Sequence, residues 1–148
     1  MIACAVGKEF IRQGYKVKFI LAGHLIDKLI KSQGYAYIKE IENEISSFFN
    51  MDLVIIDDIF DPKKSIYWNR EGGKELIITA WDNFLRYLIS NNIRIVLTSN
   101  YELEHIKEKF GNDIYELLHR NFQQLLFYDN ISETRRERIV NIFNTEES

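Results

Sequence analysis

Two short, continuous apolar runs that end in polar residues constrain the fold of this chain most. Residues 53–58 read LVIIDD and residues 94–100 read RIVLTSN. Uninterrupted apolar runs of this length, rich in β-branched residues, are typical of strands buried on both faces of a sheet. Between them, residues 75–90 carry their apolar side chains on one stripe of a helix. Two buried strands joined by a helix predict a parallel sheet with a right-handed crossover.

The same alternation of strand and helix extends over the rest of the chain. Further strands are predicted at residues 16–22 and 124–128, and the second apolar run is expected to be a strand over 93–98. Helices are predicted at residues 2–11, 24–33, 38–49, 103–110, 113–121 and 132–143, with a loop at 61–73. The expected fold is an α/β domain with helices on both faces of a parallel sheet, and with ligands at the carboxyl ends of the strands.

Composition narrows the class of protein. A chain of 148 residues is long enough for one core, and 46% hydrophobic with 28% charged residues is the balance of a folded domain. No apolar run approaches the length of a membrane span and the first residues lack a signal-peptide layout, so we expect a cytoplasmic protein with no membrane partner. Cys4 is the single cysteine, which excludes an intrachain disulfide or a cysteine cluster for a metal.

The charge pattern offers no general attraction to nucleic acid. The net charge is −3, whereas DNA binding usually depends on several lysines and arginines that neutralise phosphates. The richest basic stretch is interrupted by two glutamates and is typical of a solvated helix face. The loop at 61–73 carries side chains that could either stack on single-stranded bases or pack against the sheet: Tyr67, Trp68 and Arg70. Any DNA contact is therefore expected to be local.

Polar side chains follow both buried strands at the edge where such a sheet binds its ligand. Mg²⁺ prefers oxygen ligands and keeps several waters, so Asp57 suits a metal-binding role, directly or through water. Asp58 suits the activation of an attacking water, and Asn100 could orient that water or sense a terminal phosphate. These are parts of a phosphoryl-transfer site. The alternative interpretation is that both carboxylates only end a strand or cap the following loop.

Three stretches together resemble a known family: ACAVGKEFIRQGYKVKFILAGHLIDKL, DLVIIDDIF and IRIVLTSNYELEHI. In this order and spacing they resemble the ATPase domain of DnaC/DnaI-type helicase loaders and of IstB-type transposition helpers, which are AAA+ P-loop NTPases. The resemblance covers almost the whole chain. It implies a single AAA+ core over residues 1–148 with three layers, in which LVIIDD is the Walker B strand and LTSN is sensor 1. The implied ligands are ATP and Mg²⁺.

The sequence lacks the phosphate-binding loop that this resemblance implies. No GxxxxGK[ST] is present, and Gly7-Lys8 lies inside a predicted helix and is followed by Glu9. The family sheet has the order 5-1-4-3-2, and the chain contains strands equivalent to 2, 3, 4 and 5. A missing first strand would leave unpaired backbone groups between the strands at 93–98 and 124–128. We therefore expect an amino-terminally truncated core: either residues precede Met1 in the native protein or the fragment repacks, and these 148 residues alone should bind nucleotide poorly.

The resemblance also implies arginines that complete the site. The family's arginine finger aligns with Leu117, so Arg120 is the nearest substitute, unless it only lies on a solvated helix face. The segment SETRR resembles the sensor 2 region, which makes Arg135 the candidate for nucleotide binding and Arg136 the alternative.

Three functions follow from these observations. The first is an ATP-dependent helicase loader of the DnaC/DnaI type, a homo-oligomer with ATP between subunits that acts on a replicative helicase and on single-stranded or double-stranded DNA. The second is an IstB-like helper that directs a transposase. The third is a nucleotide-free interaction module that keeps the fold after losing its phosphate-binding loop. The parent protein is expected to be a Mg²⁺-dependent ATPase in the first two cases.

Overall fold

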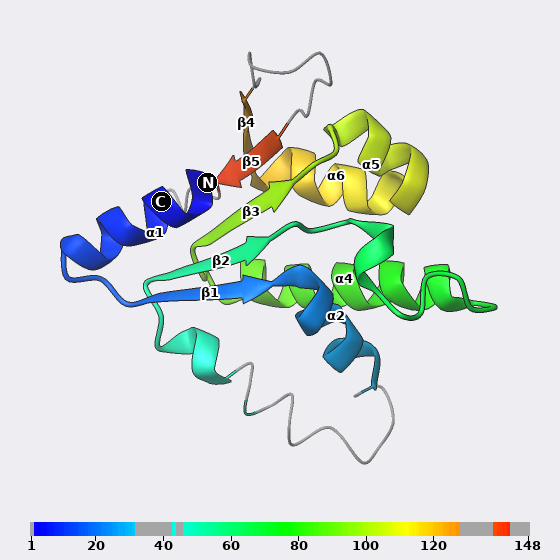
Figure 1. Ribbon diagram of the computed structural model, residues 1–148, viewed down its shortest axis with the longest axis horizontal. Coiled ribbons are helices and arrows are strands. Elements are labelled where there is room, and N and C mark those ends of the chain that lie inside the picture. The colour runs from blue at the N-terminus through cyan, green and yellow to red at the C-terminus, as the bar shows by residue number, and fades with distance from the viewer. Residues whose placement is uncertain (1, 32–42, 44–45, 128–137, 143–148) are drawn as a thin grey trace.

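A five-stranded sheet forms the centre of the molecule in the computed structural model, which describes residues 2–31, 43, 46–127 and 138–142. The strands lie in the order β1-β2-β3-β5-β4 (Figure 1). Their bounds are Val17–Leu21 for β1, Leu53–Asp57 for β2, Ile95–Ser99 for β3, Gln123–Phe127 for β4 and Arg138–Ile142 for β5. The sheet therefore contains all four strands that the sequence predicts, and one more.

The first three strands are parallel, as predicted from the two buried apolar runs. Ile55 in β2 lies opposite Phe19 of β1 and opposite Val96 of β3. The central positions of β2 are at most 1% exposed, because helices cover both faces of this strand. The α/β class and the parallel arrangement are confirmed.

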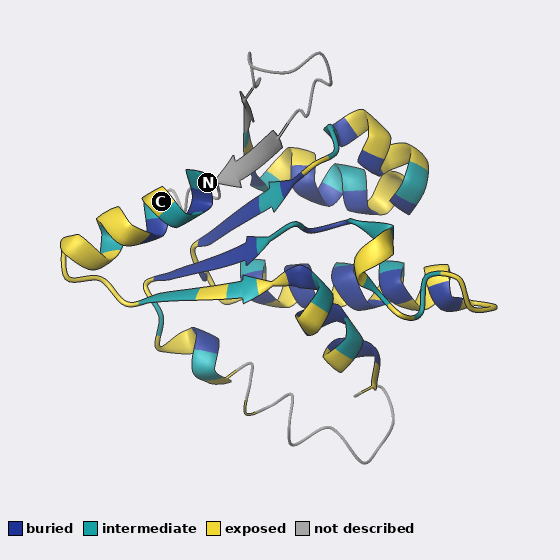
Figure 2. Cartoon of the chain, in the orientation of Figure 1, coloured by how far each residue is buried: buried dark blue, intermediate teal, exposed yellow. Residues whose placement is uncertain are grey.

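Helices cover both faces of the sheet, which Figure 2 shows through the burial of their inner sides. Helix α1 (Ile2–Arg12) packs on one face, where Ala3 lies among Leu53, Ile55 and Val96. The other face is covered by α2 (Ala22–Lys31), α4 (Gly73–Ser90), α5 (Leu103–Phe110) and α6 (Asn112–Asn121). Residues 46–49 are also helical, and Phe48 joins this second face. None of the helices within the described ranges is long and apolar enough to cross a membrane.

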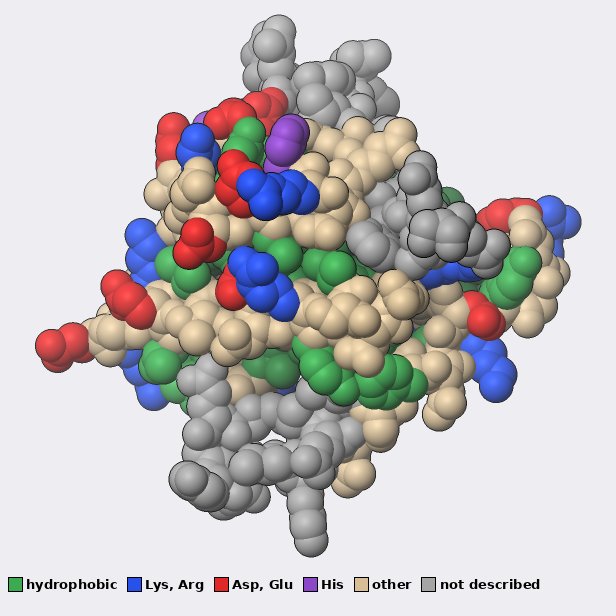
Figure 3. Space-filling view, turned by 180° about the vertical axis from the view of Figure 1, so that it is seen from behind, with side chains coloured by type: hydrophobic (Ala, Val, Ile, Leu, Met, Phe, Trp, Pro, Cys, Tyr) green, Lys and Arg blue, Asp and Glu red, His purple; other side chains and the backbone are tan. Residues whose placement is uncertain are grey.

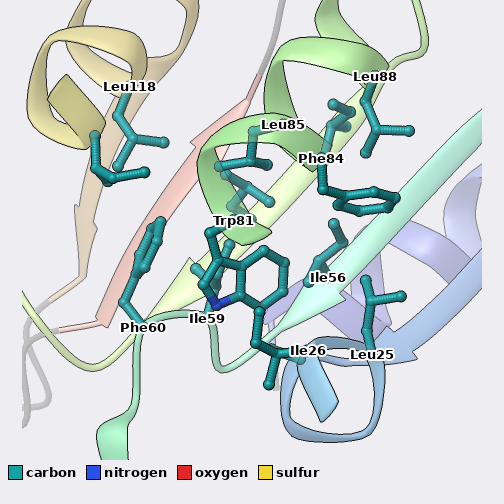
Figure 4. Close-up of a cluster of buried hydrophobic side chains, with 14 of the residues drawn as sticks. Leu25, Ile26, Ile56, Ile59, Phe60, Trp81, Phe84, Leu85, Leu88 and Leu118 are labelled. Atoms are coloured by element: carbon teal, nitrogen blue, oxygen red, sulfur yellow. The ribbon is translucent and has the colours of Figure 1, made fainter. Parts of the chain in front are cut away.

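The larger of the two hydrophobic clusters lies beneath α4 (Figure 4). Trp81, Phe84, Leu85 and Leu88 are each at most 4% exposed, at the spacing of one helical stripe. The Phe60 ring lies 6.0 Å from that of Trp81 and extends this cluster to the loop after β2. Burying side chains of this size is worth about 1.5–3 kcal/mol each, so this cluster holds the carboxyl end of β2 firmly in place.

The predicted helix at residues 132–143 is wrong for the part that the structure describes, because Arg138–Ile142 is strand β5. β5 is antiparallel to β3 and to β4 and lies between them. This is the position where the expected sheet lacks a strand. The segment RIVNI is rich in β-branched residues, which favour strands, and here it pairs backbone groups that would otherwise have no partner. Residues 132–137 lie outside the described ranges, and a single domain over 1–148 stays a prediction.

The boundaries of the loop after β2 also differ from the expectation. The predicted loop at 61–73 contains the short 3-10 helix η1 (Pro62–Lys64), and Asp61 caps it by accepting a hydrogen bond from the Lys63 N–H at 3.0 Å. Proline at the first position favours such a turn because its φ is already helical. This small helix places the next polar residues beside the end of β2. Most of the predicted helix at 38–49 lies outside the described residues.

Candidate functional site

The carboxyl ends of β2 and β3 bring Asp57, Asp58 and Asn100 together. Ile56 of β2 lies opposite Leu97 of β3, so the residues that follow them emerge at the same level of the sheet. Asn100 donates a hydrogen bond from Nδ2 to Asp58 Oδ1 at 2.6 Å. The three side chains predicted from the strand ends therefore form one cluster.

Thr98 joins the two aspartates, and sequence reasoning did not single it out. Its hydroxyl donates to Asp57 Oδ1 at 2.6 Å and accepts from the Asp58 backbone N–H at 2.9 Å. The Thr98 carbonyl oxygen also accepts from the Ile59 N–H at 2.8 Å. The predicted strands could not reveal this role, because the position of Thr98 beside Asp57 depends on the register of β2 with β3.

Asp58 has a backbone conformation that separates it from Asp57. Its φ is +62°, in the left-handed region that aspartate tolerates better than most residues. The turn ends the alternation of β2, so that Asp57 contacts Thr98 while Asp58 contacts Asn100. Two adjacent carboxylates are thereby given different partners, as different roles would require.

Lys64 is a second participant that the sequence did not reveal. Its Nζ lies 3.6 Å from Asp58 Oδ2, and the Lys64 side chain is 54% exposed against 27% for Asp58. The pKa of Asp58 is raised above its ordinary value, chiefly because burial disfavours the charged carboxylate and also because of the negative charge of Asp61. The positive charge of Lys64 partly offsets this increase, while Asp57 adds to it.

The donor set of this cluster fits a hard cation such as Mg²⁺. Asp57 has one oxygen held by Thr98 and a second oxygen that could face a metal. Within the described ranges no group of three or more histidine, cysteine or acidic side chains could hold a metal ion. Mg²⁺ commonly takes only one or two carboxylates and completes its shell with waters and substrate phosphates. Asp57 is thus the residue that would hold the metal, together with a phosphorylated substrate.

The predicted arginines are not part of this cluster in the described structure. Arg120 lies in the last turn of α6, its side chain is 75% exposed, and its Nε contacts Glu116 Oε2 at 3.1 Å. Leu117, which aligns with the expected arginine finger, is buried in the core. A role for Arg120 at a neighbouring subunit stays a prediction. Arg135 and Arg136 lie outside the described residues.

The aromatic and basic residues of the loop after β2 pack within the protein. The Trp68 ring lies 5.4 Å from the ring of Phe110 and is partly buried against the core. The Arg70 guanidinium lies 5.0 Å from the centre of the Tyr67 ring. These contacts correspond to the packing interpretation of this loop.

Comparison with known protein families places the chain in an ATP-binding family. A family model described as IstB-like ATP binding protein matches residues 1–123, which include α1 and the whole Asp57, Asp58 and Asn100 cluster. No curated protein and no solved structure matches the chain. Since the family model spans most of the sequence, the chain belongs to the IstB-like ATP-binding protein family, which includes DnaC-like AAA+ domains.

Proposed function

We propose that this chain contributes the water-activating part of a Mg²⁺-dependent ATP hydrolysis site. The observation that carries the proposal is the hydrogen bond from Asn100 to Asp58 beside the carboxylate of Asp57. Phosphoryl transfer to water uses a carboxylate for the metal, a second carboxylate for the water and a polar group that orients this second carboxylate. The family description, ATP binding, names the substrate class.

Each side chain has a role that follows from its contacts. Thr98 holds one oxygen of Asp57, which leaves the other oxygen to bind Mg²⁺, directly or through water. When bound, this metal would neutralise charge on the phosphate oxygens. Asp58 accepts a hydrogen bond from the attacking water, and Asn100 holds the Asp58 carboxylate in the required orientation.

The phosphates need further groups that residues 1–148 do not contain. No GxxxxGK[ST] occurs in this sequence, so the backbone N–H groups and the lysine that usually cradle the phosphates have no counterpart here. The experiments below therefore use the protein of the complete open reading frame.

The cellular role that the sequence resemblance favours is that of a helicase loader of the DnaC/DnaI type. In this role a homo-oligomer binds ATP between its subunits and acts on a replicative helicase and on DNA. Arg120 would then reach the nucleotide of a neighbouring subunit, and Arg135 would bind the nucleotide as the sensor 2 residue. Figure 3 shows acidic and basic side chains interspersed on one face of the molecule, so the DNA contact of a loader would be local there.

A second candidate role is that of a transposition helper, which the IstB-like description of the matching family model favours. The two roles share the hydrolysis site and differ in the partner, a replicative helicase or a transposase. A helicase-binding domain preceding the ATPase core in the complete protein would support the loader. A nucleotide-free interaction module is disfavoured by the Asp58–Asn100 contact, for which such a module has no chemical need.

Replacement of Asp58 tests the proposed function. The variant Asp58→Asn keeps the size of the side chain but removes the charge that polarises the water, so ATP hydrolysis should fall by about 100-fold or more. Nucleotide affinity, measured with a fluorescent ATP analogue, should stay within about twofold because the phosphates are bound by other groups. The control is Glu71→Gln, an exposed carboxylate outside the cluster. Unchanged hydrolysis by Asp58→Asn would exclude Asp58 from the mechanism.

A further inference from the structure

Both oxygens of the Asp58 carboxylate have a partner. Asn100 donates to Oδ1 at 2.6 Å, and the Lys64 ammonium lies 3.6 Å from Oδ2. A carboxylate that activates water needs one oxygen free to accept a hydrogen bond from that water. The Asn100 contact is short and comes from the next strand, so the oxygen to be released is the one that faces Lys64.

The backbone of Lys64 is fixed while its ammonium is not. Asp61 caps η1 through the Lys63 N–H, which holds the turn that carries Lys64. Gly23 at the start of α2 lets this turn approach closely, because a Cβ at Gly23 would lie 2.8 Å from the Lys64 carbonyl oxygen. The lysine side chain is nevertheless 54% exposed, so its head can move without any displacement of the turn.

The next residue attaches the same turn to α2 a second time. The Ser65 hydroxyl donates to Asp27 Oδ1 at 2.9 Å and accepts from the Tyr67 N–H at 3.1 Å. The Lys64 ammonium is thus tethered at the carboxyl edge of the sheet, within reach of Asp58. Any terminal phosphate placed for attack by a water at Asp58 would also lie close to this ammonium.

The Lys64–Asp58 ion pair is long, so a phosphate can compete with Asp58 for the ammonium. A separation of 3.6 Å exceeds the roughly 2.7–2.9 Å of a direct charge-assisted hydrogen bond, so the pair is weak and easily exchanged. A phosphate carries more negative charge and more acceptor oxygens than one carboxylate, and it competes well for an ammonium.

We propose that Lys64 is a positioning residue for Asp58: its ammonium holds the second carboxylate oxygen until a terminal phosphate draws it away and leaves that oxygen to the attacking water. This inference rests on the proposed function, because the phosphate is that of the bound nucleotide. It assigns a role to the turn after β2, which the sequence marked only as a loop.

The first test concerns the ion pair and needs no nucleotide. The side-chain ammonium signals of Lys63 and Lys64 are recorded by ¹⁵N–¹H NMR at low temperature in the wild type and in Asp58→Asn. The Lys64 signal should shift or broaden in the variant, and the Lys63 signal should stay, since only Lys64 faces Asp58. A Lys64 signal that does not change in Asp58→Asn would overturn the proposal, whatever the measurements with ATP show.

The second test concerns the exchange and uses Mg²⁺ and ATP with the complete protein. Lys64→Met should weaken the affinity for ATP by about tenfold and leave the affinity for ADP within about twofold, because the ammonium is drawn to the terminal phosphate, which ADP lacks. Lys64→Arg should restore most of the ATP affinity, and Lys63→Met serves as the matched control. Unchanged ATP affinity in Lys64→Met overturns the exchange. If the wild type itself binds no ATP, the proposed function and the exchange fail together, while the nucleotide-free spectra still decide whether Lys64 holds Asp58.

Discussion

Asp58 combines a left-handed backbone, a raised pKa and partners on two different elements. Asn100 follows β3 and Lys64 belongs to η1, while the backbone N–H of Asp58 donates to Thr98. Burial is the first cause of the raised pKa, so the charged form of this carboxylate opposes folding. Its orientation is therefore maintained by its neighbours at some cost in stability, which is common at functional sites.

The pH dependence of stability should report this cost. A raised pKa means that folded Asp58 binds its proton more tightly than unfolded Asp58, so the penalty is complete above the folded pKa and is relieved as the pH falls through it. Asp58→Asn should therefore raise the free energy of unfolding at neutral pH, by less than about 1 kcal/mol because solvent screens the site. The gain should vanish below the ordinary pKa of an aspartate. Urea titrations from about pH 3, which lies below the ordinary pKa of aspartate, up to neutral pH measure this difference, and a gain that persists at the lowest pH would contradict it.

Thr98 should matter more for the cluster than its modest size indicates. Thr98→Val keeps the shape of the side chain but leaves the Asp58 N–H without its acceptor and Asp57 Oδ1 without its donor. Leaving such half-buried groups unsatisfied costs about 1–3 kcal/mol. The matched control is Thr79→Val on the exposed side of α4, where no comparable loss is expected. Equal unfolding free energies of the two variants would show that the Thr98 hydroxyl does not hold the cluster.

The start of α4 shows how the loop after β2 is joined to the helix that covers the core. The Gly73 N–H donates to the Arg70 carbonyl at 2.9 Å, and the Arg70 N–H donates to the Tyr67 carbonyl at 3.0 Å. This tight turn brings the Tyr67 carbonyl oxygen against Gly73, where a Cβ would overlap it. The loop can remain closely packed on α4 only because this position has no side chain.

Gly73→Ala should consequently unfold or displace this turn. The added methyl group meets a backbone oxygen, which cannot move aside as a flexible side chain can, so a loss of about 3 kcal/mol or more is expected. Gly72→Ala is the matched control. Its φ of +68° makes alanine strained, but no atom lies within 4 Å of the new Cβ, so the loss should be only about 1–2 kcal/mol. Thermal unfolding of both variants measures which one loses more stability. A loss of stability in Gly72→Ala that equals or exceeds that in Gly73→Ala would contradict the steric argument.

Across the whole molecule, β5 determines how the sheet is completed. β3 and β4 are both antiparallel to β5, so they run in the same direction and are held apart by the width of one reversed strand. The parallel strands carry the site at their carboxyl ends, and β5 supplies the hydrogen bonds between the two parts of the sheet.

A cysteine pair tests this arrangement. Val96 lies opposite Ile142 in the β3–β5 register, and Cα atoms of opposed antiparallel residues are roughly 4.5–5.5 Å apart, within the range that a disulfide spans. With Cys4 replaced by serine, the pair Val96→Cys and Ile142→Cys should oxidise readily to an intrachain disulfide. Val96→Cys with Ile139→Cys should not, because Ile139 lies opposite Ser99. Mass spectrometry of tryptic peptides measures both yields, and equal yields would argue against the register.

Much of this architecture could be predicted from the linear sequence. The apolar runs of β2 and β3 indicated buried parallel strands, and the rule that ligands bind at the carboxyl ends of such strands led to Asp57, Asp58 and Asn100. These predictions need only local patterns. Thr98 and Lys64 could not be assigned in the same way, because their partners depend on the register of β2 with β3 and on the path of η1.

The segment at residues 138–142 also could not be assigned from local sequence patterns. Its sequence suited the end of a predicted helix, yet its β-branched residues also suit a strand, and local preference did not decide between them. This segment forms a strand because the buried N–H and C=O groups along β3 and β4 require hydrogen-bond partners, and β5 provides them. Local patterns thus determined where the strands and the carboxylates lie along the chain. Which groups face one another, and which strand lies between β3 and β4, followed only from the hydrogen bonds of the complete sheet.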